Sequence, residues 1–533
     1  MDKRHGDWWR HAVIYQVYLH SFADSSGDGV GDLPGLYRRL PYLRDLGVDA
    51  VWLTPFYVSP LADGGYDITD HRDVDPVFGT LEDVDLVLGR AHDLGLRVIV
   101  DIVPNHTSSL HPWFKEALAS EPGSQARDRY IFRPGRGLDR GEPPNDWESV
   151  FGGPAWTRAP ARDGSPGEWY LHLFAPEQPD LNWQNPQVRA EYAAVLRFWL
   201  DRGVDGLRID VAHGLVKDPT LRDAGATAQA DPFRAVPVPY FDQDGVHEIY
   251  REWRKILDSY PGERIAVAEA WVNGLHRLAR YVRPDELHQA FNFDFLRAGW
   301  DAAELRTVID GSMAATTAVG APPTWVLANH DVVRHPTRYG GGARGLRRAR
   351  AAALLMLALP GSAYIYQGEE LGLPEVTDLP NEVLQDPAWE RSGYTNRGRD
   401  GARVPMPWGG EVPPFDFSEP GVEPWLPMPA DWRSLTVAAQ AAHPDSTYHL
   451  YRSALRIRRD HPALGDGDLA WLDAPDDVLL FAREPGLVCA VNLGAQPVAV
   501  PLGDSVLCAT APVRRSEAGW LLPADSAVWL GLA

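Results

Sequence analysis

The sequence predicts an α/β protein built around a closed (β/α)8 barrel, and three observations lead to that fold class. Three stretches, Leu43–Leu53, Ala91–Val103 and Trp199–Asp210, repeat one pattern of amphipathic helix, glycine and short apolar strand. Further strand-like segments bring the helix–strand units to eight, and from about Trp471 the pattern changes to short alternating segments. Alternating helices and buried strands indicate a parallel sheet covered by helices, and eight such units favour a closed TIM barrel.

The three best-defined helices carry start and stop signals. Apolar residues at positions 36, 40, 43 and 46 have helical spacing, and Gly47 suits the left-handed residue that follows a helix. Thr80 is the expected N-cap of a helix that reaches about Asp93. Asn185-Pro186 opens a third helix as N-cap and first helical residue, and Gly203 ends it.

The barrel strands are expected where short apolar runs follow the helices. No glycine-rich dinucleotide fingerprint follows the first of them, which counts against a nucleotide-binding fold. The eight expected strands are Val13–Leu19, Val48–Leu53, Leu96–Val103, Val204–Ile209, Arg264–Ala268, Gln289–Phe293, Thr324–Ala328 and Ala363–Tyr366.

Two long segments interrupt the barrel pattern. The segment after the third strand is rich in Pro, Gly and Trp, with strand-like pieces at Tyr130–Phe132 and Trp169–Phe174, and a loop of such length is usually functional or a small domain. A second insertion, at about 371–429, follows the last strand. We therefore expect a barrel (domain A) over 1–104 and 175–460 and an inserted domain B over 105–174.

The last part of the chain is expected to form a C-terminal antiparallel β domain, domain C, over 461–533. A helix around Tyr451–Arg458 precedes it. Short runs bounded by turn residues are typical of antiparallel strands. The expected strands are Val478–Ala482, Leu487–Asn492, Val498–Pro501, Val506–Thr510 and Ala527–Leu530.

Composition and charge exclude several classes of protein. Lys and Arg number 51 and Asp and Glu 73, so the net charge is −22. This balance argues against nucleic acids and anionic membranes, because both require basic patches. The longest apolar run, Ala351–Pro360, is short of the ~20 residues that span a bilayer. The first residues contain no apolar stretch typical of a signal peptide.

Only two cysteines are present, Cys489 and Cys508, which is too few for a disulfide framework or a cysteine metal site. We expect two buried thiols in a reducing compartment. Without a signal-peptide stretch or a membrane-spanning run, the protein is expected to be cytoplasmic. The sequence leaves open whether it is a monomer or a small homo-oligomer.

Carboxylates follow several strands at the end where such barrels place catalysis. Asp210 follows the fourth strand, Glu269 the fifth and Asp331 the seventh. Each alone could be a strand terminus that binds a loop, but together they are expected to converge on one mouth. Neighbouring like charges raise the pKa of one member, which creates a proton donor beside an ionised nucleophile. Retaining glycoside hydrolysis uses that pair.

Arg208 lies two residues before Asp210, so both side chains share one face of the strand. Its guanidinium is expected to keep Asp210 ionised and oriented. An ion pair that merely lines the barrel would leave the same trace in the sequence.

An oxygen-rich segment near the N-terminus suits a hard cation. Alternate side chains and one backbone carbonyl, with glycines to turn the loop, are typical of a Ca²⁺ or Mg²⁺ site, although an acidic turn would look similar. The expected ligands are Asp24, Ser26, Asp28, Val30 (through its carbonyl) and Asp32.

Four segments in order resemble the signature regions of the α-amylase family, glycoside hydrolase family 13. They are Asp101–His106, Gly206–Gly214, Val267–Trp271 and Trp325–Asp331. Gln178–Trp183 resembles the additional region near the end of domain B, in wording typical of the oligo-1,6-glucosidase and α-glucosidase branch. The likeness runs from about Val13 to the C-terminal domain. Ala328 departs from the fourth region, where many relatives have Asn, and is expected to alter packing and not the reaction.

The resemblance implies roles for the strand-end residues. Asp210 resembles the nucleophile, Glu269 the general acid/base and Asp331 the carboxylate that binds ring hydroxyls and stabilises the transition state. The remaining counterparts are the subsite −1 histidines His106 and His330, the nucleophile's partner Arg208 and the supporting aspartate Asp101.

The resemblance also implies a pocket closed behind the terminal glucose. Tyr66 resembles the stacking tyrosine, and Asp67 the aspartate that grips the non-reducing end. Arg399 and Arg403 match the exo-acting branch, and one of them, Arg399 in the first place, is expected to pair with Asp67. A closed pocket implies removal of one glucose at a time. Relatives also bind a structural ion at the loop that matches Asp24–Asp32, although Ser26 is a weaker ligand than Asp or Asn.

The implied function is an exo-acting, retaining α-glucosidase that acts on maltose-like or other short α-glucosides without an organic cofactor. The alternatives are an oligo-1,6-glucosidase, acting on isomaltose-type substrates, and a transglucosylase or sucrose-type isomerase on the same scaffold. A non-catalytic relative, such as the heavy subunits of amino-acid transporters, is least favoured because all three carboxylates are present.

The sequence cues for linkage conflict. Val211, directly after the expected nucleophile, leans towards α-1,6 bonds in relatives. The sequences of Val211–Gly214 and Glu269–Trp271 more closely resemble α-glucosidases of actinobacterial type that take maltose-like substrates. One methyl group in a pocket gives only about 1–3 kcal/mol of discrimination, so dual activity is retained as an alternative. We place α-1,4 ahead.

Overall fold

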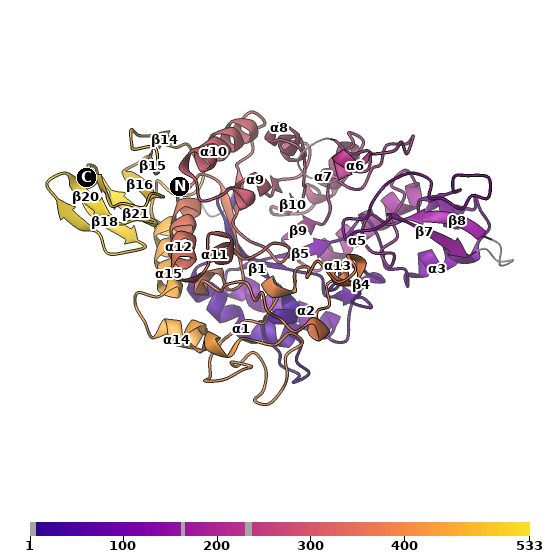
Figure 1. Ribbon diagram of the computed structural model, residues 1–533, viewed down its shortest axis with the longest axis horizontal. Coiled ribbons are helices and arrows are strands. Elements are labelled where there is room, and N and C mark those ends of the chain that lie inside the picture. Colours follow the sequence, from indigo (N-terminus) through magenta and orange to yellow (C-terminus); the bar gives the residue numbers. More distant parts are fainter. Residues whose placement is uncertain (1–6, 161–165, 230–236, 533) are drawn as a thin grey trace.

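The computed structural model describes residues 7–160, 166–229 and 237–532. Among them, eight parallel strands form the central ring of a (β/α)8 barrel with helices outside it (Figure 1), as the sequence predicts. The apolar core lies between the ring and the helices. The strands are β1 (Val13–Val17), β2 (Ala50–Leu53), β5 (Arg97–Ile102), β9 (Gly206–Ile209), β10 (Ile265–Ala268), β11 (Gln289–Ala290), β12 (Thr324–Val326) and β13 (Ser362–Tyr366).

The ring follows chain order and is nearly closed. Strand pairing runs from β12 through β13, β1, β2, β5, β9 and β10 to β11. No paired ladder joins β11 to β12 in the described part of the chain, but the Asn292 amide donates to the Thr324 carbonyl across this seam at 3.1 Å. The carboxyl ends of all these strands therefore face one mouth.

Two helices begin at the N-caps that the sequence predicts, and a third has an N-cap, Asp32, that the sequence analysis did not name. Asp32 accepts from the Gly35 amide and caps α1 (Leu33–Leu46), which ends at Gly47 with a φ of 106°. Thr80 and Asp83 form a capping box for α2 (Leu81–Asp93), and Asn185 caps α5 (Pro186–Asp201). Unsatisfied N–H groups at a helix start explain why these polar residues stand there.

The remaining helices cover the barrel or lie in its connections. Among the described residues, none is long and apolar enough to cross a bilayer. The α-helices are α7 (Val246–Leu257), α8 (Leu275–Leu278), α9 (Phe293–Arg297), α10 (Ala302–Thr317), α11 (His335–Arg338), α12 (Gly342–Ala358), α14 (Val437–Ala441) and α15 (Thr447–Asp460). The 3-10 helices are η1 (Trp8–Arg10), η2 (Leu19–Ser21), η3 (Ala279–Val282), η4 (Glu369–Leu371), η5 (Asn381–Val383), η6 (Asp400–Ala402) and η7 (Ala430–Leu435).

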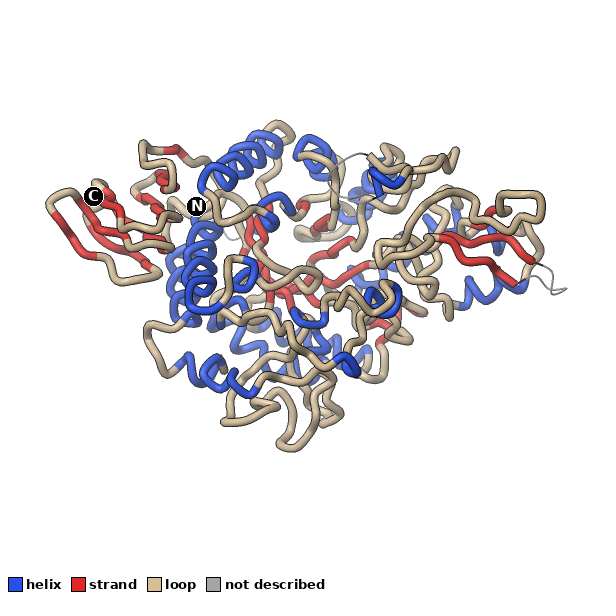
Figure 2. Tube along the Cα trace, viewed as in Figure 1, coloured by secondary structure: helices blue, strands red, loops and turns tan. Residues whose placement is uncertain are grey.

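The first insertion lies between β5 and α5 and projects from the barrel, to the right in Figure 2. Its sheet has the order β6-β8-β7, and it includes one strand, β7, that the sequence analysis did not predict. Its elements are α3 (Pro112–Ala119), α4 (Gln125–Asp128), β6 (Phe132–Arg133), β7 (Trp156–Pro160) and β8 (Pro166–Leu171). Near the barrel mouth lie β3 (Tyr57–Val58), β4 (Asp70–Val74) and α6 (Ala226–Gln229).

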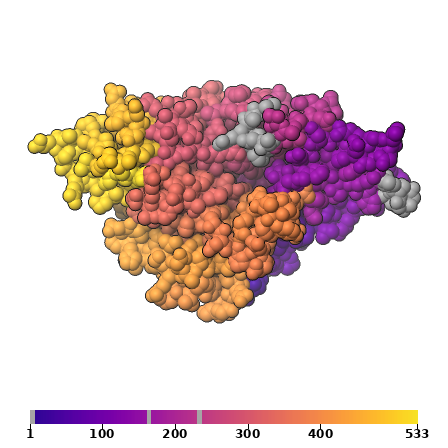
Figure 3. All heavy atoms as spheres, viewed as in Figure 1, coloured from indigo at the N-terminus to yellow at the C-terminus, as the bar shows by residue number. Residues whose placement is uncertain are grey.

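The second insertion, after β13, packs against the first. Its helix α13 (Pro387–Arg391) contributes Ala388 to an apolar cluster with Phe151 and Ala175. Arg391 donates to the Gly152 carbonyl at 2.6 Å. Figure 3 shows this insertion (orange) beside the first one (purple). The two insertions thus form one rim.

The C-terminal residues form two antiparallel sheets, β14-β15-β16-β21-β18 and β17-β20-β19. Five of these strands are those expected; β14, β19 and β20 were not predicted, and β19 reads Arg-Arg-Ser with no apolar alternation. Both cysteines are buried and free, as expected. The strands are β14 (Ala470–Trp471), β15 (Val478–Arg483), β16 (Leu487–Asn492), β17 (Val498–Val500), β18 (Ser505–Ala509), β19 (Arg514–Ser516), β20 (Gly519–Leu522) and β21 (Ser526–Gly531).

Asp525 ties this domain to the barrel and should matter for stability. Its buried carboxylate accepts from Arg348 Nε at 2.8 Å and Trp300 Nε1 at 2.9 Å. Asp525→Asn removes the charge that Arg348 faces, and we expect it to lower the free energy of unfolding by about 1.5–3 kcal/mol. Urea denaturation followed by tryptophan fluorescence measures this, with the exposed Glu517→Gln as control. Equal midpoints for the two variants would contradict the assignment.

Candidate active site

The strand-end residues singled out in the sequence meet at the carboxyl end of the barrel. Asp101 lies in β5, Arg208 in β9, and Asp210 and Glu269 directly follow β9 and β10. All four are buried. Parallel pairing places Asp101 opposite Arg208, so the register of two neighbouring strands brings these side chains together.

The guanidinium of Arg208 joins three carboxylates. Its Nη1 lies 2.8 Å from Asp101 and 2.5 Å from Asp210, and its Nη2 lies 3.0 Å from Glu269. The Trp52 ring centroid lies 5.0 Å from the guanidinium carbon. The two carboxylates expected to react are therefore held on one cation.

One guanidinium cannot neutralise three buried carboxylates. Burial in the first place, with Glu269, Asp101 and Asp331 adding to it, raises the pKa of Asp210 well above its usual value although Arg208 opposes this. Burial likewise raises the pKa of Asp101 to about 6. Arg208 alone therefore does not keep Asp210 ionised, contrary to the sequence-based expectation, and the cluster as a whole retains a proton at a pH where exposed carboxyls are ionised. For Asp210 to act as a nucleophile, this shared proton must lie on its partner carboxyl.

Asp331 lies in a more positive environment. It receives Arg399 Nη1 at 3.0 Å, Arg403 Nη2 at 3.1 Å and His330 Nε2 at 3.3 Å. Burial raises the pKa of Asp331, but His330 and the arginines outweigh it and hold the pKa below the usual range. Burial holds the pKa of His330 well below its usual value, so we attribute the ionised state of Asp331 to the two guanidiniums.

Tyr66 and His106 line the same space. The Tyr66 ring stacks on His330 with centroids 5.4 Å apart, and its hydroxyl donates to Asp101 at 3.0 Å. His106 Nε2 lies 3.1 Å from the Tyr66 carbonyl and 3.1 Å from the Gln178 side-chain nitrogen. Burial lowers the pKa of His106 to about 4, so this ring is neutral near pH 7.

The expected pairing of Asp67 with Arg399 or Arg403 is wrong, because Arg399 binds Asp63. Arg399 Nη2 lies 2.7 Å from Asp63 Oδ1, and Arg403 reaches the His330 carbonyl and Asp331. Asp67 is turned into its own loop, where it accepts from the Ser59 hydroxyl and the Asp63 amide. Asp63 and Asp67 stand on either side of the same Gly-Gly turn, so their spacing does not indicate which of them Arg399 binds.

The structure also adds residues that the sequence analysis gave no role. Asp386 accepts from Arg399 Nε at 2.5 Å and caps α13, which fixes the guanidinium between Asp63 and Asp331. Phe151 lies under Arg399 at 4.9 Å, and Phe174 lies 5.2 Å from His106. These residues stand in the two insertions, where no periodic pattern indicates them.

Val211 has an unusual backbone. Its φ is 44°, a left-handed conformation that is strained for a β-branched residue. Its amide donates to Glu269 Oε2 at 2.9 Å, while its side chain packs in an apolar cluster that includes Ile131 and Trp147 of the first insertion.

The predicted metal loop does not gather its oxygens around one point. Asp24 accepts from the amides of Gly27 and Gly29 and from the Ser418 hydroxyl, and Asp32 caps α1. No group of three His, Cys, Asp or Glu side chains suited to a metal ion occurs in the described ranges. The carboxylates of Asp24, Asp28 and Asp32 bind donors of the loop, so the geometry gives the ion no support.

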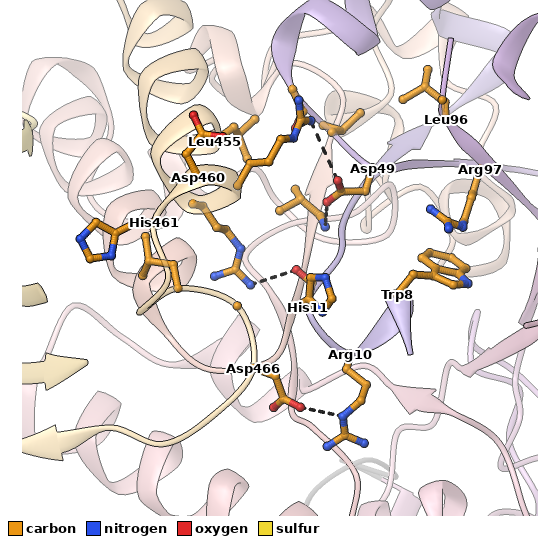
Figure 4. Close-up of a pocket in the computed structure, with 18 of the residues that line it drawn as sticks. Trp8, Arg10, His11, Asp49, Leu96, Arg97, Leu455, Asp460, His461 and Asp466 are labelled. Atoms are coloured by element: carbon orange, nitrogen blue, oxygen red, sulfur yellow. Dashed lines mark hydrogen bonds and ion pairs between the residues drawn. The ribbon is translucent and has the colours of Figure 1, made fainter. Parts of the chain in front are cut away.

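A cavity of about 970 Å³ lies at the opposite end of the barrel (Figure 4). It is lined by strand starts and by the end of α15. Its charged side chains pair with one another, as Arg10 does with Asp466 at 2.6 Å and Arg459 with Asp49 at 3.9 Å. It is therefore separate from the strand-end cluster.

The similarity to known proteins extends along almost the whole chain. The family model for the alpha amylase catalytic domain matches residues 16–467. A Rhizobium meliloti (strain 1021) protein named "Probable alpha-glucosidase" is 40% identical over 532 residues, which cover 96% of this chain and 92% of that protein. The oligo-1,6-glucosidase of Parageobacillus thermoglucosidasius is 36% identical over 543 residues, covering 94% and 93%.

A solved structure adds to these relatives. The alpha-glucosyl transfer enzyme XgtA has a TM-score of 0.88 and 39% identity, covering 98% of this chain and 99% of that chain.

Asp67 should make stability depend on pH. Burial raises the pKa of Asp67 to about 6, so ionisation costs stability that is present at low pH and is lost as pH rises from about 4 through 6. We expect Asp67→Asn to gain about 2 kcal/mol relative to the unmodified chain between pH 4.5 and 7.5. Urea unfolding at both pH values measures this, and Asp70→Asn, at an exposed position, is the control. A constant difference between the two pH values would refute it.

Proposed function

The chain belongs to the α-amylase family and is a glycoside hydrolase, and we propose that it is an exo-acting, retaining α-glucosidase that releases α-glucose from short α-glucosides. The observation that carries this proposal is the pair of carboxylates, Asp210 and Glu269, held on the Arg208 guanidinium at the barrel mouth. Asp331, held by Arg399 and Arg403, supplies a third carboxylate.

The reaction follows from these groups by double displacement. Asp210 attacks the anomeric carbon, and Glu269 gives its proton to the departing oxygen. Glu269 then takes a proton from water as the water attacks the same carbon and releases Asp210, so the α-configuration is retained. Asp331 stays ionised and stabilises the positive charge of the transition state while it binds ring hydroxyls.

The ion-pair cluster around Arg399 supports exo action. Arg399 links Asp63 to Asp331 and is braced by Asp386, so a charged cluster stands behind the terminal glucose. Tyr66 provides a ring face, and His106 and His330 provide hydrogen bonds from neutral imidazoles. No organic cofactor is expected for this family, because carboxylates supply both the nucleophile and the proton.

We place α-1,4 bonds ahead of α-1,6 bonds as the preferred linkage. The similarity to a protein named as an α-glucosidase supports this, and the similarity to an oligo-1,6-glucosidase supports the alternative. Val211 packs into the cluster beside the first insertion, so its effect on linkage would be exerted through the pocket wall.

Glucosyl transfer is the second candidate function. The similarity to an alpha-glucosyl transfer enzyme supports it. The same residues serve both reactions, since a sugar hydroxyl replaces water as the acceptor; the sucrose-type isomerase is the intramolecular version of this transfer.

The location of the protein and the bounds of its domains are also proposed. We propose a cytoplasmic location, and the domain ranges 1–104 with 175–460, 105–174 and 461–533 as the division of the chain. The oligomeric state is left open between monomer and small homo-oligomer.

The decisive experiment follows glucose released from maltose and from isomaltose by NMR. We expect α-glucose as the first product from maltose, and Asp210→Asn to lower kcat by more than about 10³-fold because the nucleophile is lost. Faster release from isomaltose would move the assignment to an oligo-1,6-glucosidase, and disaccharide products at high substrate would favour transfer. First-formed β-glucose would exclude a retaining mechanism.

We also propose that the Asp24–Asp32 loop binds Ca²⁺ or Mg²⁺ as a structural ion, on the spacing of its oxygen residues alone. EDTA should then lower the melting temperature and Ca²⁺ should restore it, because an ion bound to the native state stabilises it. Asp28→Ala should abolish the response, whereas Asp466→Ala, at the other end of the barrel, should retain it. A melting temperature insensitive to EDTA and Ca²⁺ would dismiss the ion.

A further inference from the structure

Three N–H donors contact the Glu269 carboxyl, and they are divided unequally between its oxygens. Oε2 accepts a hydrogen bond from the Val211 amide at 2.9 Å and forms an ion pair with Arg208 Nη2 at 3.0 Å. Oε1 accepts from the Trp271 indole Nε1 at 2.9 Å. A carboxyl oxygen has two lone pairs in its plane, so Oε2 faces one N–H and one guanidinium, whereas Oε1 keeps one position free.

This division determines which oxygen can carry the proton. An O–H on Oε2 would point at the Val211 N–H or at the positive charge of Arg208, and both arrangements are unfavourable. From this geometry we propose that Trp271 is a positioning residue, which orients Glu269 so that Oε1 carries the proton transferred to the leaving group. The inference rests on the proposed function, in which Glu269 is the general acid/base.

The indole is held firmly enough to orient a carboxyl. The Trp271 ring stacks on Phe293 with centroids 3.6 Å apart and an interplanar angle of 8°. The Arg297 guanidinium carbon lies 4.5 Å from the same ring. Phe293 and Arg297 lie one helical turn apart on α9, so that one short helix fixes the indole.

The donors on the other oxygen are equally fixed. Val211 donates the N–H that faces Glu269, and its own backbone adopts the left-handed conformation. A Cβ on Gly214 would lie 2.6 Å from a Val211 methyl carbon, so Gly214 leaves room for the Val211 side chain as it is placed. Strained backbone at such a position is typical of functional sites.

The proposed arrangement assists both halves of the reaction. In the first half the proton passes from Oε1 to the glycosidic oxygen as the C–O bond breaks and Asp210 bonds to the anomeric carbon. The carboxylate left on Glu269 then accepts the two N–H bonds and faces the Arg208 cation, and all three interactions are stronger with the ionised form. In the second half Oε1 takes the proton from the attacking water and the bond to Asp210 breaks.

Trp271→Phe tests this role, because it keeps an aromatic ring on Phe293 and removes the N–H. We expect kcat/KM for the preferred disaccharide to fall about 10- to 100-fold, the range for a hydrogen bond to a charged group. For α-glucosyl fluoride, whose leaving group needs little protonation, we expect a loss below about threefold. The basic limb of the pH profile for the disaccharide should move to higher pH, since the ionised acid is less stabilised.

Trp520→Phe is the matched control, because it removes an indole hydrogen bond to the Gly503 carbonyl at 3.0 Å in the C-terminal domain. It should leave both substrates and the pH profile unchanged. Equal losses on disaccharide and fluoride, an effect on KM alone, or no loss would overturn the role of Trp271. An unmodified protein that cleaves neither the disaccharides nor the fluoride would instead overturn the proposed function.

Discussion

The arrangement of the barrel mouth depends on one buried guanidinium, that of Arg208. A charge this far from water is stable only when carboxylates surround it, and three do so. They come from three neighbouring strands, β5, β9 and β10, whose parallel register must be kept for the contacts to form. A slip by one residue would turn each side chain to the other face of its strand. The charge balance of the site therefore depends on the register of these three strands.

Arg399 plays the corresponding part on the opposite side of the pocket, but its partners come from loops. Asp63 precedes a Gly-Gly turn, Asp386 begins a short helix of the second insertion, and Asp331 follows β12. The first insertion adds Phe151 beneath the guanidinium. The barrel therefore supplies the reacting groups, while the insertions build the wall behind them.

The sequence predicts the parts of this site that lie in regularly repeating helix–strand units. The barrel strands and the ends of its helices follow from apolar runs, glycines and caps, and Asp210, Glu269 and Asp331 follow from their places after strands. The pairing of Arg399 with Asp63 and not Asp67 could not be predicted, because it depends on how a glycine turn directs two nearby acids. The strain at Val211 is likewise invisible in sequence, since valine is among the residues least expected with a positive φ. The strand β19 was missed because its residues are exposed and carry no alternation.

The open seam between β11 and β12 has a mechanical consequence. Glu269 follows β10, two strands along the ring from β12, and Asp331 lies just beyond β12, so the seam runs between them. Where strand pairing is sparse, local opening needs less free energy than elsewhere in a sheet. Strand pairing therefore constrains the distance between Glu269 and Asp331 less than the distance between Asp210 and Glu269, which follow the paired strands β9 and β10.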